Sequence, residues 1–243
     1  MTVKKTLKIF SILLSLSMPL SGLHAEDAAA PEKPARIKPA ERKAALAALV
    51  ETRPNGDVVI MPNPASDMSL ASKSPKMPEA VMELMLHIDP ELNFDKFNKS
   101  IMKNAAGTGD VRIRETMAGC DDYLSALGFG IKRIKFNPGT IRGRINAGIP
   151  FFIAVYNKDG WDAKLSERSQ RRPKDGDWKE WKTSLRKETL KGNPKGVIGR
   201  LEWCLVKGYN KESGEFMVKV KGRDIWMAEP EIKLLQHSFY EVR

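Results

Sequence analysis

The chain has 243 residues, a formal net charge of +11 at neutral pH and two cysteines. Its length supports one sizeable core or two small domains. It contains no GxxxxGK[ST] loop, no GxGxxG motif after a strand, and no closely spaced cysteine pair with clustered histidines. We therefore expect no nucleotide site, no metal and no other cofactor.

The first 25 residues have the pattern of a secretory signal peptide. Three lysines form a basic start, residues 9–20 are an apolar stretch too short to span a bilayer, and small residues precede a cleavage point after Ala25. No later apolar run approaches membrane length. We expect an exported protein, periplasmic or extracellular, without a transmembrane anchor.

Charge and composition divide the rest of the chain. Residues 26–39 are rich in Ala, Pro and charge and are expected to form a disordered linker, and residues 40–243 a single domain. Cleavage removes three lysines and no acid, so the net charge falls from +11 to +8. Residues 164–200 contain 12 Lys or Arg and 5 Asp or Glu, a net of +7. Nearly all of the excess therefore lies in one basic insert at about 160–200.

The first half of the domain is expected to be mainly helical. Apolar spacing and breakers predict helices at 40–50, 78–87, 93–103 and 114–127, a strand at 57–61, and a Ser-rich loop before residue 76. Pro78 stands at an allowed first-turn position, and Asn93 is expected to cap the helix that follows it.

Strands dominate the second half. They are predicted at 131–136, 149–156, 201–207, 215–221, 224–227 and 238–242, with helices at 140–147, 177–190 and 229–236. The nearly continuous apolar segment 149–156 is typical of a central strand, and Gly208-Tyr209-Asn210 predicts a hairpin turn. Leading helices followed by strands predict an α+β fold with a mostly antiparallel sheet.

Side chains that could carry catalysis are few. A thiol nucleophile needs a base and a lowered pKa, whereas the two aspartates after Cys120 would raise its pKa, so a buried helix residue is the simpler interpretation. His87 and His237, the histidines of the mature chain, are interpreted as cap or surface residues. The carboxylates of the insert are expected to form ion pairs.

Several segments resemble a known family. INAGIPFFIAVYN, the insert with DWKEWK, and LEWCLVKGYNKESGEF with SFYEV as final strand span about 140–243. They resemble exported bacterial members of the bacteriocin-processing-type, papain-like cysteine peptidases, and SPKMPEAVMELMLHIDPELNFDKF is similar to that family's catalytic segment and the helices after it. The resemblance implies a papain-like α+β fold, with N-terminal helices packed on a mostly antiparallel C-terminal sheet.

The same resemblance implies that the catalytic set is lost. In such peptidases a cysteine attacks the carbonyl, a histidine takes its proton, and an Asp or Asn orients the ring. Carried over by position, these three residues fall on Lys76, Glu202 and Val220, and neither Cys120 nor Cys204 matches a catalytic position. We therefore expect no catalytic residue, and a Lys76–Glu202 ion pair across the old cleft.

This predicts an exported, catalytically degenerate peptidase-like protein that binds or regulates an unknown peptide or protein. Two alternatives stay open: an active cysteine peptidase that uses Cys120 or Cys204, and a cationic envelope-associated binding protein. In the resembled fold the strand face of Cys204 looks toward the helices that carry Cys120, so these thiols could be bonded or free.

The basic insert suggests a further binding surface. Trp178 and Trp181 are expected to bury one side of their helix and to turn Lys179, Lys182 and Arg186 outward. Clustered cations attract anionic polymers or an anionic envelope surface with a steep salt dependence, and nothing in the insert predicts specific nucleic-acid recognition. The residues expected to bind anions are Arg168, Arg171, Arg172 and Lys174.

Overall fold

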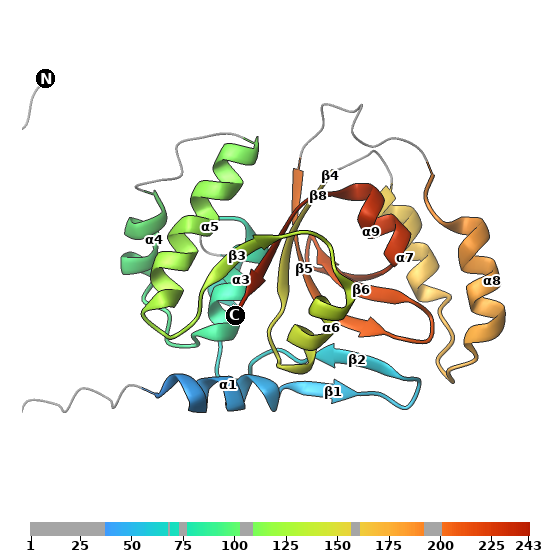
Figure 1. Ribbon diagram of the computed structural model, residues 1–243, viewed down its shortest axis with the longest axis horizontal. Coiled ribbons are helices and arrows are strands. Elements are labelled where there is room, and N and C mark those ends of the chain that lie inside the picture. The colour runs from blue at the N-terminus through green and yellow to red at the C-terminus, as the bar shows by residue number, and fades with distance from the viewer. Residues whose placement is uncertain (1–36, 68, 73–76, 103–108, 157–160, 192–200) are drawn as a thin grey trace, which may run out of the picture. The chain divides into compact units, whose positions relative to one another are not determined.

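Figure 1 shows the computed structural model, which describes residues 37–243 with gaps at 68, 73–76, 103–108, 157–160 and 192–200. The signal peptide 1–25, nearly all of the linker 26–39, and Lys76 lie outside the described residues, as do both ends of the basic insert. Residues 37–243 form one compact unit. The linker boundary is corrected at its end, because Pro39 is the first residue of a helix.

An antiparallel sheet of eight strands organises the domain. The strands are β1 (Val50–Thr52), β2 (Asp57–Ile60), β3 (Ile131–Ile134), β4 (Phe151–Tyr156), β5 (Leu201–Asn210), β6 (Glu215–Val220), β7 (Arg223–Ala228) and β8 (Gln236–Val242). Their main order is β1-β2-β5-β4-β8-β3, and β6 pairs with both β5 and β7. Because β5 pairs with β2, β4 and β6, it joins the two branches of the sheet.

Helices lie on both faces of this sheet. They are α1 (Pro39–Ala47), α2 (Ser69–Ser72), α3 (Glu79–Ile88), α4 (Phe94–Met102), α5 (Gly109–Ser125), α6 (Pro138–Asn146), α7 (Trp161–Gln170), α8 (Trp178–Glu188) and α9 (Glu229–Leu235). In Figure 1, α3, α4 and α5 group beside one face, and α7, α8 and α9 group on the other side. The predicted α+β class with an antiparallel sheet is confirmed.

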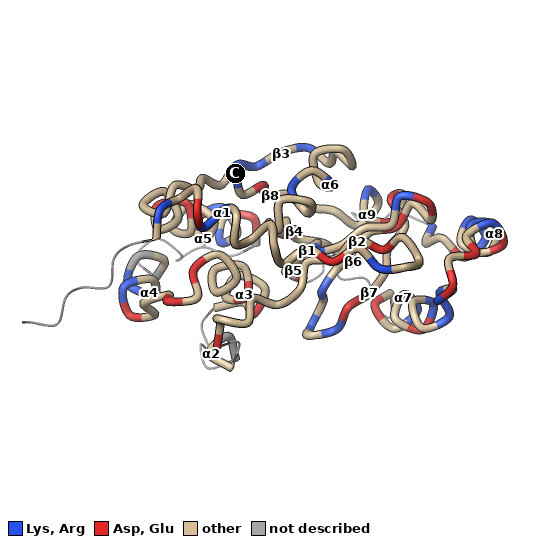
Figure 2. Tube along the Cα trace, turned by 90° about the horizontal axis from the view of Figure 1, so that it is seen from below, with Lys and Arg blue, Asp and Glu red and all other residues tan. Residues whose placement is uncertain are grey.

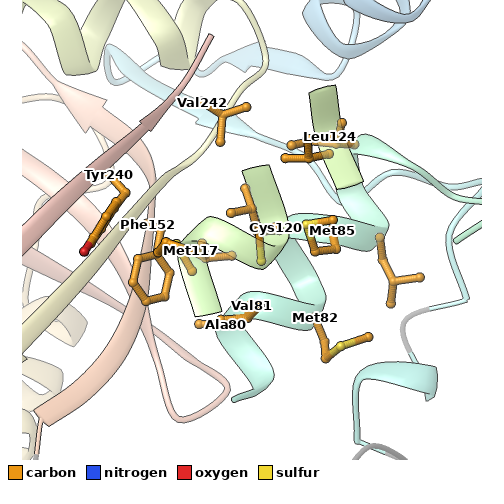
Figure 3. Packing of buried hydrophobic residues seen from close by; sticks show 14 of the residues in the cluster. Ala80, Val81, Met82, Met85, Met117, Cys120, Leu124, Phe152, Tyr240 and Val242 are labelled. Atoms are coloured by element: carbon orange, nitrogen blue, oxygen red, sulfur yellow. The ribbon is translucent and has the colours of Figure 1, made fainter. Parts of the chain in front are cut away.

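Two large apolar cores follow from this layering. Along β4, Phe152 and Ala154 pack into the core beneath α3, α4 and α5, while Phe151, Ile153 and Val155 pack into the core beneath α6, α7 and α9. Figure 3 shows part of the first core, which we call the α3 core. The second is called the α7 core. Strand β4 is buried on both faces between β5 and β8, so the prediction of a central strand is confirmed.

Local sequence explains several element ends. The Asn93 side chain accepts a hydrogen bond from the Lys96 amide at 2.9 Å, which confirms it as the cap of α4. Asn137 caps α6 in the same way, through the Thr140 amide at 3.1 Å. Gly148 ends α6 with a φ of +71°, and a Cβ atom there would lie 1.8 Å from the carbonyl oxygen of Leu46. Only glycine fits this close contact.

Some predicted elements are wrong. Residues 208–210 continue β5 rather than forming the hairpin turn, because they pair with both β2 and β6; the turn follows at Lys211–Gly214. Helix α1 ends earlier than expected and leaves room for β1, and the Ser-rich loop contains the short helix α2. Helix α7 was not predicted. Its buried side consists of Trp161, Leu165 and Arg168, so the many charged residues of this segment leave no regular apolar spacing.

Candidate functional site

Two adjoining hollows lie between α3 and strands β5 and β6. The larger has a volume of about 210 Å³, and the smaller about 60 Å³. Glu83 and Lys219 line both, so we treat them as one α3 groove. The larger hollow is lined by Pro78, Glu79, Ala80, Glu83, Glu202, Trp203, Lys219, Lys221 and Gly222. The smaller is lined by Ile60, Met61, Pro62, Asn63, Glu83, His87, Pro150, Leu205, Lys207 and Lys219.

The floor of the α3 groove is largely apolar. Alternate residues of β5 turn toward α3, so that Trp203 lines the larger hollow and Leu205 the smaller one. The Trp203 ring is half-buried and meets Phe152 edge to face, with 5.2 Å between ring centroids. This packing fixes an aromatic surface beside the first turn of α3.

Ion pairs line the walls of the groove. Glu83 of α3 pairs with Lys219 of β6. Glu202 lies 3.1 Å from the Lys221 ammonium, which is also 3.5 Å from Asp162 of α7. The Glu202 hydrogen bond raises the pKa of Lys221, so this side chain carries its positive charge throughout the neutral range.

A tight turn positions Lys221. Val220 and Arg223 pair as the last residues of β6 and the first of β7, and Lys221 and Gly222 connect them with φ angles of +48° and +75°. Positive φ is uncommon for a lysine, and such residues gather where the surrounding structure holds them in place. Here Glu202 and Asp162 hold the lysine at the mouth of the larger hollow.

Of the three positions matched to a catalytic triad, Glu202 and Val220 lie among the described residues. Glu202 lines the larger hollow and pairs with Lys221. Val220 is buried in the α7 core, and its apolar side chain offers no oxygen to orient an imidazole. The expected ion pair between Lys76 and Glu202 concerns a residue outside the described ones, so it stays a prediction.

Both cysteines are free and fully buried, which is one of the two states that the sequence left open for them. Cys120 belongs to the α3 core, and Figure 3 shows it among Val81, Met85 and Met117. Cys204 points to the opposite side of the sheet, into the α7 core. The expected orientation of Cys204 toward the helices of the α3 core is therefore wrong, because Trp203 and Leu205 occupy that face.

The thiols are poorly placed for nucleophilic chemistry. Burial raises the pKa of Cys120, and the neighbouring Asp121 raises it further. Burial also raises the pKa of Cys204, with Glu202 adding to the effect. A nucleophilic thiol needs the reverse shift. Cys120 is, as expected, a buried helix residue.

The histidines contact groups other than the thiols. His87 is buried, not a cap or surface residue, and its Nε2 lies 2.7 Å from the carbonyl oxygen of Gly148. Burial lowers the pKa of His87. His237 is half-buried, with Nδ1 3.9 Å from Asp110, and burial lowers its pKa as well. Between described residues, no hydrogen bond joins a thiol to an imidazole.

Two of the four residues expected to bind external anions are instead part of the interior. Arg168 donates two hydrogen bonds, of 2.7 and 2.6 Å, to the buried carboxylate of Glu231. Arg172 binds Asp57 at 3.0 and 3.1 Å and Glu215 at 2.9 Å. The expectation is wrong for Arg168 and Arg172, since burial and pairing remove both from solvent.

The other two residues are exposed. Arg171 is half-exposed and lies 2.7 Å from Glu188 at the end of α8, and Lys174 is exposed on the loop before α8. Trp178 and Trp181 are buried, while Lys179 and the rest of the outward side of α8 are exposed. The predicted orientation of this helix is therefore confirmed.

Sequence reasoning missed the charged residues that line the groove. Glu83 is a buried carboxylate in the middle of α3, between apolar neighbours, and a buried carboxylate indicates a polar partner nearby. Lys219 and Lys221 had no such signal, because their role depends on the β6–β7 turn that brings them to α3.

Metal-binding clusters and membrane-spanning helices are absent from the described part of the chain. Within it, no three His, Cys, Asp or Glu side chains gather in a way that could hold a metal ion. Across the same residues, every helix is too short or too polar to cross a bilayer.

Comparison with protein-family models, with curated proteins and with solved structures finds no match.

Proposed function

We propose that this is an exported, catalytically degenerate relative of papain-like cysteine peptidases that binds a polypeptide in the α3 groove. The observation that carries the proposal is the composition of the larger hollow. The start of α3 and Glu202, more than a hundred residues later in the chain, line the same hollow, and Glu202 pairs with Lys221 there.

The position of this hollow supports a lost active site. In the resembled family, the nucleophile precedes the helix that corresponds to α3, and its histidine lies on the strand that corresponds to β5. Pro78 and Glu202 bring these two places together at one hollow. Glu202 is paired with Lys221 there, and neither cysteine lines the hollow, so this position holds no thiol for a base to activate.

The properties of the groove fit a polypeptide ligand. Its floor offers apolar and aromatic surface from Trp203 and Leu205, and its walls offer charges of both signs from α3 and β6. Binding sites typically combine an apolar lining with a few convergent polar groups. An extended segment with one apolar side chain and a neighbouring carboxylate would match Trp203 and Lys221.

The buried thiols argue against the active-peptidase alternative. Cys120 and Cys204 lie in two different cores, and neither lines the α3 groove. Their raised pKa values oppose thiolate formation at neutral pH. The proposal therefore assigns binding without turnover.

Selection of random peptides displayed on phage tests this function. Peptides that bind residues 26–243 would be measured against the unaltered protein and two groove variants, Trp203→Leu and Lys221→Asn. Asparagine tolerates the positive φ at position 221, so the second variant removes the charge without straining the turn. Each variant should weaken peptide binding by roughly fivefold or more, because each removes a side chain that the proposal places against the peptide.

A control on the neighbouring β5–β6 turn makes the test specific. Lys211→Asn removes an equivalent charge from the exposed β5–β6 turn and should leave binding unchanged. Equal binding by both groove variants would place the peptide elsewhere. Hydrolysis of a selected peptide that is lost in Cys120→Ser or Cys204→Ser would establish the peptidase alternative instead.

A further inference from the structure

The charges of the insert fall into two groups, one paired inside the domain and one exposed on α8. Arg168 and Arg172 are bound to carboxylates of β2, β6 and α9, and Arg171 is bound to Glu188. Across the described part of the chain, the four basic side chains of α8 take part in no ion pair. These are Lys179, Lys182, Arg186 and Lys187.

Helical geometry collects these four cations on one stripe. At 100° per residue, an arc of about 140° on the α8 surface holds Lys182, Arg186, Lys179, Thr183 and Lys187 in that order. No carboxylate falls within this arc. Glu180 lies just beyond its edge, and Glu188 lies on the far side, where it binds Arg171.

The opposite face of α8 fixes the orientation of the stripe. Trp178, Trp181 and Leu185 are buried, and the indole N–H groups of the two tryptophans donate to the Asn55 carbonyl oxygen and to Glu215. The helix therefore cannot roll about its axis without breaking buried contacts. In Figure 2, α8 lies at the outer end of the insert, with basic residues along its trace.

The stripe borders an open hollow rather than a flat surface. This hollow has a volume of about 500 Å³, and Lys179, Lys182 and Arg186 form one wall. Two carboxylates also reach it. Asp177 is engaged in capping α8 through the Lys179 amide, and Glu212 approaches from the β5–β6 turn, so cations still outnumber acids along the wall.

We propose that this stripe binds a linear anionic polysaccharide through its sulfate or carboxylate groups. Along the helix axis the cations extend over roughly 12 Å, a distance that one small anion cannot span. The face offers no exposed apolar side chain to enter a bilayer. Trp178 also lines the hollow, but it is only 4% exposed and offers too little ring surface to stack on a base. A chain with repeated anionic groups matches both the length and the concave shape. The proposal is independent of the α3 groove.

A triple variant with a charge-matched control tests the stripe. Lys179→Gln, Lys182→Gln and Arg186→Gln would be combined in one protein, and Lys96→Gln, Lys99→Gln and Lys132→Gln in another. All six side chains are exposed, and both variants lose three positive charges. Any difference between them therefore reports the location of the charges and not the net charge.

The probe is a size-defined heparin oligosaccharide, titrated against residues 26–243 at several salt concentrations. The unaltered protein has four cationic contacts, so its affinity should fall roughly fiftyfold between about 50 and 200 mM salt. The stripe variant keeps one of them, so its affinity should fall only about threefold over the same range. The stripe variant should bind at least about tenfold more weakly at the lower salt concentration, and the control variant should bind as the unaltered protein does.

Two further probes separate the other classes of anion. Vesicles of equal parts phosphatidylcholine and phosphatidylglycerol, and single-stranded oligothymidine, would be titrated in parallel. Equal heparin affinity for both triple variants would overturn the proposal, as would tighter binding to vesicles or to oligothymidine than to heparin. Each variant should unfold thermally at the same temperature as the unaltered protein. Equal unfolding temperatures show that weaker binding does not come from loss of the fold.

Discussion

The ion pairs under the insert and those at the mouth of the α3 groove differ in burial. Arg172 and its partners Asp57 and Glu215 have side chains no more than 6% exposed. Lys221 and Glu202, at the groove, have side chains 47% and 20% exposed. Both regions contain ion pairs between a basic side chain and carboxylates, but the two sets of pairs differ in their exposure to solvent.

A buried pair is difficult to open and an exposed pair is easily exchanged. Removing one partner of a buried pair leaves an uncompensated charge in the interior, whereas a solvated pair contributes little to stability. The arginines beneath α7 and α8 therefore serve to fix the insert on the sheet. The ammonium group of Lys221 can release Glu202 for a ligand carboxylate at small cost.

The largest expected effect tests the buried side of this comparison. Arg172 also stacks on Trp226, with 3.6 Å between the guanidinium carbon and the ring centroid. Arg172→Ala would leave Asp57 and Glu215 buried without their cation, so the free energy of unfolding should fall by about 3–5 kcal/mol in urea titrations.

Arg171→Ala is the neighbouring control. Its partner Glu188 is solvated, so losing this pair should leave the urea midpoint nearly unchanged. Equal effects of the two substitutions would mean that burial does not distinguish the arginines of the insert.

Replacing the thiols extends the comparison to uncharged polar groups. Cys204→Ser places a hydroxyl in an apolar core, on a strand, and should destabilise the protein by about 1–3 kcal/mol. Cys120→Ser should cost less, because a serine in a helix can donate to the carbonyl four residues earlier. In the unaltered protein, a thiol reagent should react with two cysteines after denaturation without reductant and with neither before it.

The fold was predictable where apolar spacing is regular. Strand β4 and helix α3 combine long apolar segments with clear breakers, and both were expected close to their observed positions. Helix α7 was missed because its buried stripe includes Arg168, which a sequence pattern counts as polar. Only the position of Glu231 in the folded domain shows why that arginine is inside.

The site was less predictable because it depends on distant pairing. Glu202 could be singled out because it falls on the histidine position of the resembled family, but its partner Lys221 becomes apparent only when β6 turns into β7. Likewise, the direction of Cys204 depends on which face of β5 meets α3, and alternation alone does not decide between two buried faces.

A pH titration compares a buried titratable group with a half-buried one. Burial lowers the pKa of His87 in the folded protein, so the unfolded chain takes up a proton first as the pH falls. Stability should therefore be complete above the ordinary value of 6.5 and decrease below it toward the folded pKa, by at most about 1.4 kcal/mol per pH unit.

His87→Gln should flatten this decrease in urea titrations between pH 8 and pH 5. His237→Gln should flatten it less, because His237 is only half-buried and the carboxylate of Asp110 opposes the lowering of its pKa. If the two variants flatten the curve equally, the deeper burial of His87 has no measurable consequence.

The smallest expected effect tests the exposed side of the comparison. Lys221→Asn removes the cation at the mouth of the α3 groove while the β6–β7 turn keeps a residue that accepts positive φ. Since the Lys221 side chain is nearly half-exposed, its ion pairs with Glu202 and Asp162 should contribute no more than about 1 kcal/mol to the free energy of unfolding. The measurement is the urea midpoint of the variant beside that of Lys211→Asn on the neighbouring turn. A loss as large as that of Arg172→Ala would show that Lys221 is a structural residue rather than an exchangeable one, and it would remove the reason to expect a ligand carboxylate beside Glu202.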